Sequence, residues 1–553
     1  MTIVAQDPLV RDADGRILTA QVPVPIDLFA PGPWGHRVHV IDYDATRRWY
    51  EAPVSFVPTF EFDDAFVGAD DNTLLTNSAF HAQNVYAIAS RTLAVFEQAL
   101  GRRSPWSFAG HALVLAPHAF VEQNAYYSDD DQALLFGYFP GSGDETVYTC
   151  LSHDIVAHET THAVLDGLRR RYLEPSLPDQ PAFHEAFADI VALLSVFSVV
   201  EVVQRLLGDP DAQGRIAADK VSVPTLKQTA LVGLAEQMGD EVYAERGNSL
   251  RRSVELDPSP SWRTDPKFLK SHRRGEVLVA AVMQTLLRMW VHRLAALIHG
   301  GGLDLTRAAE EGAKSAGHLL TMLIRAIDYL PPVDFRFEDF LEAIFVSDSE
   351  IAPDDAHEYR DALVEAFALF GIERPAQGLI DMSAMPVRPL YEHLHSGALR
   401  TDPDEIERFI WQNASLLGLN TYYYTNVESV RPAVRVGPDG FVVNEFVADY
   451  VQLLNGTPPD LRVLGLTTPP GMPDDTKIQL LGGGVLVFDE WGGLKFHHPK
   501  PLFDWARQDA RLAFLFERRL TDTHGRFGFS LGTPRGQSFA AFHTPDQRAE
   551  EDW

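Results

Sequence analysis

Apolar residues recur along the middle of the chain every three to four positions, which is the spacing of helices. Between residues 152 and 168 apolar side chains recur at helical spacing, which predicts one helix. Ser152 is a suitable N-cap for it, Asp154 places negative charge in its first turn, and Gly167 lies near its end. The following run at residues 190–200 is apolar on nearly all sides, so we predict a second, buried helix there.

Further elements are predicted toward the carboxyl terminus. Helical patterns occur at residues 277–297, 305–329, 337–345, 358–370, 403–417 and 502–520. The segment 373–378 contains proline, glycine and charged residues and predicts a linker. Beyond it strand signals prevail: residues 441–451 are β-branched and aromatic, and residues 485–496 have the pattern of a hairpin. The patterns together predict an α+β chain.

The first two predicted helices carry the residues for metal chemistry. His158 and His162 are four positions apart, about 40° around a helix, so both can bind one ion. Glu159 projects toward the same ion and is suited to accept a proton from water. Glu185 and Asp189 share one face of the second helix, where a buried carboxylate must be paired or bind a metal. Glu185 fits a third zinc ligand, and Asp189 would orient a ligating histidine.

These motifs resemble a known family. The sequences HETTHAV at 158–164 and EAFAD at 185–189 resemble the thermolysin-like metalloendopeptidases, gluzincins in which HExxH is completed by a distal glutamate. The resemblance implies one catalytic Zn²⁺ and hydrolysis of internal bonds in a peptide or protein by metal-activated water, with Glu159 as general base. It also implies structural calcium, but this is doubtful here because Val196 replaces an acid that the site requires.

The resemblance extends to residues that contact substrate. Asn124 and Ala125, with the apolar segment 134–138 after them, resemble the family's edge strand, which holds an extended peptide. Ser249-Leu250-Arg251 resembles the segment whose arginine binds a substrate carbonyl, so Arg251 is a candidate and Arg252 an adjacent rival.

Three more positions bear on the reaction itself. His272, at the start of an apolar helix, resembles the histidine that stabilises the oxyanion, although its interval to Gly275 is one residue shorter than the family's. Asp265 is a candidate partner for that histidine. Tyr172 lies one position early for the family's oxyanion tyrosine, and packing in the core or at the rim is an equal alternative.

The resemblance covers about residues 55–373 and implies a two-lobed catalytic domain. Its amino-terminal lobe would be rich in strands and its carboxy-terminal lobe helical, with the zinc helix forming the floor of a cleft between them. Residues 1–54 are expected to be an extension partly packed on the catalytic lobe. Residues 374–553 are expected to form a strand-rich α+β domain of unknown role.

Composition limits the kinds of partner and the cellular compartment that we expect for this protein. The 553 residues carry a formal charge of -30, which argues against nucleic acid and other polyanions. No secretory signal is visible at the amino terminus, and the apolar run after Asp189 is too short to span a bilayer. The single cysteine, Cys150, fits a reducing compartment. We therefore expect a cytoplasmic protein without membrane contact, with leaderless export as the alternative and the oligomeric state open.

Three other functions remain open on the sequence alone. An aminopeptidase would share the zinc motif, but no G-x-M-E-N segment for the substrate's free amine is present. In a non-catalytic zinc-stabilised interaction protein a general base such as Glu159 would be unnecessary. A protease-derived toxin or effector would use its carboxy-terminal domain to recognise the target. The pair His497-His498 lacks further ligands nearby in sequence and is expected to be structural.

Overall fold

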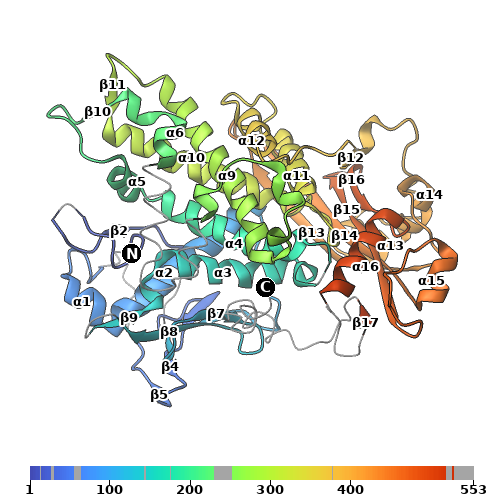
Figure 1. Ribbon diagram of the computed structural model, residues 1–553, viewed down its shortest axis with the longest axis horizontal. Helices are drawn as coiled ribbons and strands as arrows, with labels where there is room; N and C mark the ends of the chain where they lie inside the picture. Colours follow the sequence, from blue (N-terminus) through green and yellow to red (C-terminus); the bar gives the residue numbers. More distant parts are fainter. Residues whose placement is uncertain are drawn as a thin grey trace.

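The computed structural model describes residues 1–12, 14–25, 30–54, 64–141, 145–174, 176–228, 252–376 and 378–518, and the backbone of 526–527 (Figure 1). Its amino-terminal lobe contains a five-stranded sheet in the order β3-β6-β8-β7, with β9 pairing β8. The strands are β3 (Val38–Val40), β6 (Leu113–Phe120), β7 (Ala125–Ser128), β8 (Ala133–Pro140) and β9 (Thr146–Tyr148). Among the described strands β7 pairs with β8 alone, antiparallel to it, and is therefore an edge strand.

Long helices form the centre of the molecule and the helical lobe. They are α2 (Ser78–Leu100), α3 (His153–Leu168), α4 (Asp179–Phe197), α9 (Ser271–Ala295), α10 (Leu305–Ala326), α11 (Phe337–Ile351) and α12 (Tyr359–Ala368). α3 packs against α4, and α4 against α9, so the two predicted metal-binding helices are neighbours in the core (Figure 1). This arrangement confirms the predicted strand-rich lobe followed by a helical one.

Short elements complete the amino-terminal and helical lobes. The strands are β1 (Thr2–Val4), β2 (Thr19–Gln21), β4 (Tyr43–Asp44), β5 (Trp49–Tyr50), β10 (Arg215–Ala217) and β11 (Gly302–Asp304). The helices are α1 (Asp71–Thr76), α5 (Val200–Leu207) and α6 (Val223–Leu226), with 3₁₀ turns η1 (Thr149–Leu151), η2 (Arg170–Leu173), η3 (Ala218–Val221), η5 (Pro260–Arg263) and η6 (Pro266–Leu269). β1 and β2 pair in antiparallel orientation. The Val4 amide donates to the Asn84 side chain of α2, so the amino-terminal segment packs against α2.

The carboxy-terminal region is a six-stranded sheet with helices. Its order is β12-β16-β15-β14-β13, with β17 pairing β15. The strands are β12 (Ile380–Asp381), β13 (Tyr424–Val436), β14 (Val442–Gly456), β15 (Lys477–Asp489), β16 (Leu494–Lys500) and β17 (Arg526–Phe527). The helices are α13 (Pro403–Gln412), α14 (Ala414–Leu417), α15 (Pro458–Leu464) and α16 (Trp505–Glu517), with η7 (Met382–Ala384) and η8 (Ala398–Arg400). β15 and β16 form the hairpin that the sequence predicts.

The two faces of this sheet belong to different cores. Val447, Val485 and Val487 join the large core shared with α3, α4 and α9, whereas Phe446 and Phe488 pack with α13 on the other face. Alternate residues of a strand point to opposite faces, which is why neighbours in sequence divide in this way. The sheet is therefore buried against the helical lobe, and the proposed boundary at 373/374 stays a prediction.

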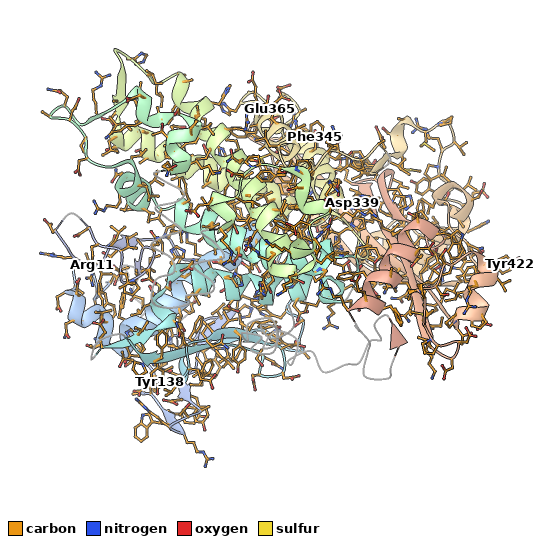
Figure 2. All side chains as sticks on the ribbon, viewed as in Figure 1. Arg11, Tyr138, Asp339, Phe345, Glu365 and Tyr422 are labelled. Atoms are coloured by element: carbon orange, nitrogen blue, oxygen red, sulfur yellow. The ribbon has the colours of Figure 1, made fainter. Side chains whose placement is uncertain are left out.

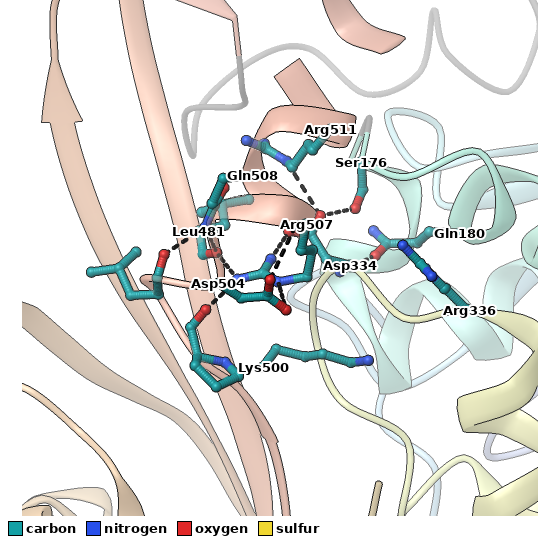
Figure 3. Close-up of polar contacts among 12 residues, drawn as sticks. Ser176, Gln180, Asp334, Arg336, Leu481, Lys500, Asp504, Arg507, Gln508 and Arg511 are labelled. Atoms are coloured by element: carbon teal, nitrogen blue, oxygen red, sulfur yellow. Dashed lines mark hydrogen bonds and ion pairs between the residues drawn. The ribbon is translucent and has the colours of Figure 1, made fainter. Parts of the chain in front are cut away.

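Paired charges line the junction between the sheet and the helical lobe. Asp334 accepts ion pairs from Arg507 and Arg511 of α16 and a hydrogen bond from Ser176 (Figure 3). Asp339, labelled in Figure 2, contacts His498 Nε2 at 3.3 Å and Lys500 Nζ at 2.6 Å. Buried charges are tolerated only when paired, and removing one partner typically costs about 3–5 kcal/mol. These ion pairs hold β16 and α16 of the carboxy-terminal region against the helical lobe.

A second charged group lies along the same junction. Burial alone would raise the pKa of Asp328, but the guanidinium groups of Arg102 and Arg435 hold that pKa below its ordinary value. Arg435 also contacts Glu445 at 3.2 Å.

The histidine pair of β16 lies at the same junction. His498 Nδ1 lies 2.9 Å from the Tyr329 carbonyl, and His497 Nε2 lies 2.8 Å from the Tyr450 hydroxyl. Both histidines have protein partners, as expected of a structural pair.

Helix α4 starts earlier than predicted, and the start of α3 is not capped as predicted. α4 begins at Asp179, several residues before Glu185, because Pro181 is tolerated in the first turn of a helix. Ser152 occupies the N-cap position of α3, but its hydroxyl donates to Asp7 and Asp154 and does not cap the helix. α9 is long and apolar enough to cross a bilayer by length and composition, but 78% of its most apolar window is buried inside the protein, which is typical of a core helix.

Candidate active site

Two histidines of α3 face each other at the centre of the site. His158 Nε2 and His162 Nε2 lie 2.8 Å apart, and their rings are nearly perpendicular, at 86°. The one-turn spacing brings the rings together, and both side chains are buried. Imidazole nitrogens in this arrangement can bind one metal ion.

Glu185 of α4 completes the group. Its Oε2 lies 3.8 Å from His158 Nε2, and its Oε1 lies 3.7 Å from His162 Nε2. One donor atom from each of the three residues lies within 4.8 Å of the others. Two imidazoles and one carboxylate form a donor set suited to zinc, and the packing of α3 on α4 brings it together.

Partners behind the ligand atoms orient the two histidines. His158 Nδ1 lies 2.9 Å from Asp189 Oδ1, so Nδ1 carries the proton and Nε2 turns its lone pair toward Glu185. His162 Nδ1 lies 2.9 Å from Nδ1 of His184, and these two rings are stacked 4.9 Å apart. Burial lowers the pKa of His184 to about 3, so this ring is neutral and can accept a hydrogen bond. No role was predicted for His184 from the sequence, although its position directly before Glu185 indicated that it lies close to the metal ligands.

Glu159 lies between the zinc helix and the edge strand. Its Oε2 accepts a hydrogen bond of 3.1 Å from the Tyr127 amide of β7, and its side chain is fully buried. Because this amide points away from β8, the free edge of β7 faces the site. Alternate residues of a strand direct their backbone groups to the same side, so Ala125 presents its backbone to that edge as well. The Ala125 amide donates to Oδ1 of the Asn124 side chain at 2.9 Å.

His272 lies at the entrance to the group, at the start of α9. Its Nδ1 is 3.8 Å from Glu185 Oε2, and its side chain is 49% exposed, so it reaches both the buried carboxylate and solvent. Gly275 makes this approach possible: a Cβ there would lie 3.0 Å from the Ala182 carbonyl oxygen of α4. The close crossing of α9 and α4 thus brings a residue 87 positions from Glu185 to the same site.

Of the other predicted residues, Arg252 and Asp265 have partners elsewhere in the part of the chain that the structure describes. Arg251 lies outside the described residues, and its rival Arg252 pairs with Glu276 at 3.0 Å. Asp265 caps η6 by accepting from the Lys267 amide at 3.0 Å, which is a local structural role.

The position of Tyr172 decides between its two interpretations. Its ring is fully buried against Phe183 and Phe335, and its hydroxyl points to the Leu330 carbonyl at 3.5 Å. Burial raises the pKa of this phenol above its ordinary value. Tyr172 therefore takes the packing role that the sequence left as the alternative to the oxyanion, because η2 turns the side chain into the aromatic core.

Comparison with known proteins supports the geometry. Residues 37–166 match the family described as thermolysin metallopeptidase, catalytic domain, whereas no curated protein matches the chain significantly. The match begins before the expected residue 55, at the start of the sheet, and it includes the whole histidine pair of α3. It ends before α4, so Glu185 is joined to the site by the fold. The match supports a thermolysin-like metallopeptidase, and the fold packs Glu185 beside the matched histidine pair.

Proposed function

We propose that the protein is a zinc-dependent endopeptidase that hydrolyses internal bonds of peptides or proteins, with Glu159 as general base. The observation that carries the proposal is the convergence of donor atoms from His158, His162 and Glu185 within 4.8 Å. Glu159 lies next to this donor set and is not part of it. A buried carboxylate beside a three-ligand zinc site suits proton transfer, whereas a purely structural zinc needs no base.

The donor set fits Zn²⁺ in number and chemistry. Three protein ligands of the His₂Glu type are typical of catalytic zinc, which keeps a further position open. Asp189 supports the assignment because a carboxylate behind a ligating histidine fixes its tautomer and raises its basicity. When bound, zinc would supply Lewis acidity toward a peptide carbonyl and lower the pKa of a water molecule.

Glu159 and His272 divide the proton and charge chemistry. The Glu159 carboxylate would accept the proton of the attacking water and return it to the leaving amine. Its hydrogen bond from the Tyr127 amide aligns the side chain between β7 and the ligand cluster. His272, half-exposed at the cluster's rim, would donate to the oxygen on which negative charge develops.

The free edge of β7 is the proposed binding surface for substrate. An extended peptide can add to an exposed strand edge through backbone hydrogen bonds, which require no particular side chain. Asn124 and Ala125 lie at the start of this edge, and Tyr127 connects it to Glu159. A peptide bound there would pass alongside the general base, as internal cleavage requires.

The substitution Glu159→Gln tests the proposal. It keeps the size of the side chain and leaves the three ligands intact, so the variant should bind zinc as the wild type does. Its kcat on a quenched fluorescent peptide should fall by roughly 10²–10⁴-fold, the usual contribution of general acid–base catalysis. Metal analysis and cleavage assays on the same preparation measure both quantities.

Glu365→Gln is the matched control, because Glu365 is exposed on α12 and, within the described residues, forms its ion pair with Arg288 (Figure 2). This variant should cleave at the wild-type rate. Undiminished cleavage by Glu159→Gln would remove Glu159 from the mechanism. Zinc binding without cleavage in the wild type would favour the zinc-stabilised interaction protein instead.

A further inference from the structure

A second group of metal-binding side chains lies in the amino-terminal lobe. His81 of α2, His118 of β6 and Cys150 of η1 each offer a donor atom, and these atoms lie within 4.8 Å of one another. All three are buried, with exposed fractions of 1%, 9% and 0%. The group shares no residue with the candidate active site.

The outer nitrogens of both histidines contact oxygen atoms. His81 Nε2 lies 3.2 Å from the Leu74 carbonyl oxygen and 3.1 Å from that of Leu75, so Nε2 carries the proton. His118 Nδ1 lies 2.7 Å from Asp42 Oδ2, so its proton is on Nδ1. The inner nitrogens, His81 Nδ1 and His118 Nε2, are 2.8 Å apart. In these tautomers two lone pairs face each other, so either a proton or a metal ion lies between the two nitrogens.

The catalytic histidines show the same arrangement. Nε2 of His158 and Nε2 of His162 are also 2.8 Å apart, and Asp189 lies behind His158 as Asp42 lies behind His118. A carboxylate behind a ligating histidine is the usual second partner in metal sites. The two groups differ in their third ligand, which is a carboxylate in one and a thiol in the other.

The surroundings of the second group suit a bound cation with a thiolate ligand. The Cys150 side chain is fully buried, and a bound metal ion would displace the proton of its thiol. The Tyr148 ring lies 4.7 Å from His81 and 5.2 Å from His118, and Tyr138, labelled in Figure 2, packs edge-on against His118. A dipositive ion with one thiolate keeps one positive charge, which the Asp42 carboxylate would balance.

We propose that His81, His118 and Cys150 bind a second zinc ion, distinct from the catalytic one. Imidazole and thiolate are ligands that zinc prefers and that calcium and magnesium do not. The three ligands come from a helix, a sheet strand and the turn that directly precedes the zinc helix α3. Zinc binding there would connect the start of α3 to the sheet and to α2. The competing occupant is a proton shared between the two nitrogens.

The test counts metal ions in the full-length protein. After purification in the presence of zinc and removal of loosely bound metal, the wild type should hold two zinc ions per chain. Cys150→Ser should hold one and still cleave peptides, because Cys150 is not among the active-site residues. His162→Ala should also hold one, but should have no activity. The two variants therefore lose different ions.

Cobalt substitution identifies the ligand without relying on a variant's stability. Wild-type protein reconstituted with Co²⁺ should show a thiolate-to-cobalt charge-transfer band. His162→Ala should keep this band, and Cys150→Ser should lose it. One ion per chain in both the wild type and Cys150→Ser, with no such band in the wild type, would overturn the proposal in favour of a shared proton. Because the band and the count do not depend on cleavage, the result is independent of the proposed peptidase function.

Discussion

The two histidine groups of this protein are alike in geometry and different in origin. In each, two ring nitrogens approach to 2.8 Å and a carboxylate lies behind one ring. The catalytic pair lies four residues apart on one helix, whereas His81 and His118 are 37 residues apart on different elements. A helix brings the first pair together by its own periodicity, but only the packing of α2 against β6 and η1 brings the second together.

The surroundings of the two groups also differ, and they indicate different uses. The catalytic group adjoins the free edge of β7, the carboxylate of Glu159 and the half-exposed His272. The second group is packed against tyrosine rings, and its ligands connect three elements. A site that accepts a substrate needs an open side and a base, whereas a structural metal site needs neither. The two proposals therefore give turnover to the first group and stabilisation to the second.

The largest expected effect separates the groups by activity. His162→Ala removes a ligand from the catalytic group, so peptide cleavage should fall to background because zinc is no longer held by three residues. His118→Ala should leave cleavage measurable but lower the melting temperature, because a bound ion stabilises the folded state by mass action. Peptide assays and thermal unfolding with and without added zinc measure both effects. Equal loss of cleavage in the two variants at a temperature where both are folded would contradict the assignment.

A smaller effect concerns the carboxylates behind the histidines. Asp189→Asn and Asp42→Asn remove the same charge from equivalent positions, and each should weaken zinc binding at its own site roughly 10–100-fold. Only the first variant should need more zinc for full activity. Titration of the metal-free variants with zinc, followed by cleavage assays, measures the two affinities. If Asp42→Asn shifts the activity curve as far as Asp189→Asn, the two sites are not independent.

The third prediction uses an ordinary buried histidine as a reference. His153 differs from both groups because its nitrogens face oxygen atoms, the Ala5 carbonyl at 2.9 Å and the Ser195 hydroxyl at 3.0 Å. Burial, aided by the charge of Arg91, lowers its pKa to about 3. The unfolded chain therefore binds one more proton than the folded one between pH 6.5 and 3, so the free energy of unfolding falls as the pH falls.

This histidine should contribute about 1.4 kcal/mol per pH unit within that window. In His153→Gln the loss of stability on acidification should be shallower by that amount. Denaturant unfolding between pH 7 and pH 4, in excess chelator so that metal release does not contribute, measures the slope. Parallel pH profiles for the variant and the wild type would show that folding does not lower the pKa of His153.

Local patterns predicted much of the fold and part of the site. The helices α3, α9, α10 and α12 and the β15–β16 hairpin lie close to the predicted residues. Their apolar spacing reflects burial on one side, which is a property of each segment alone. The start of α4 was missed because the residues before Glu185 lack an apolar period. Tyr172 was uncertain because its distance from the motif does not show which way η2 turns its side chain.

The sequence by itself determined the zinc motif. Residues four apart in a helix lie on the same side, so His158 and His162 meet whatever surrounds them. It also predicted the pairing of Glu185 with that motif through resemblance. Only the tertiary structure decided that His272 approaches Glu185 and that Tyr127 contacts Glu159, since each contact joins separate elements. The same holds for His81, His118 and Cys150, whose proximity results from the packing of a helix, a strand and a turn.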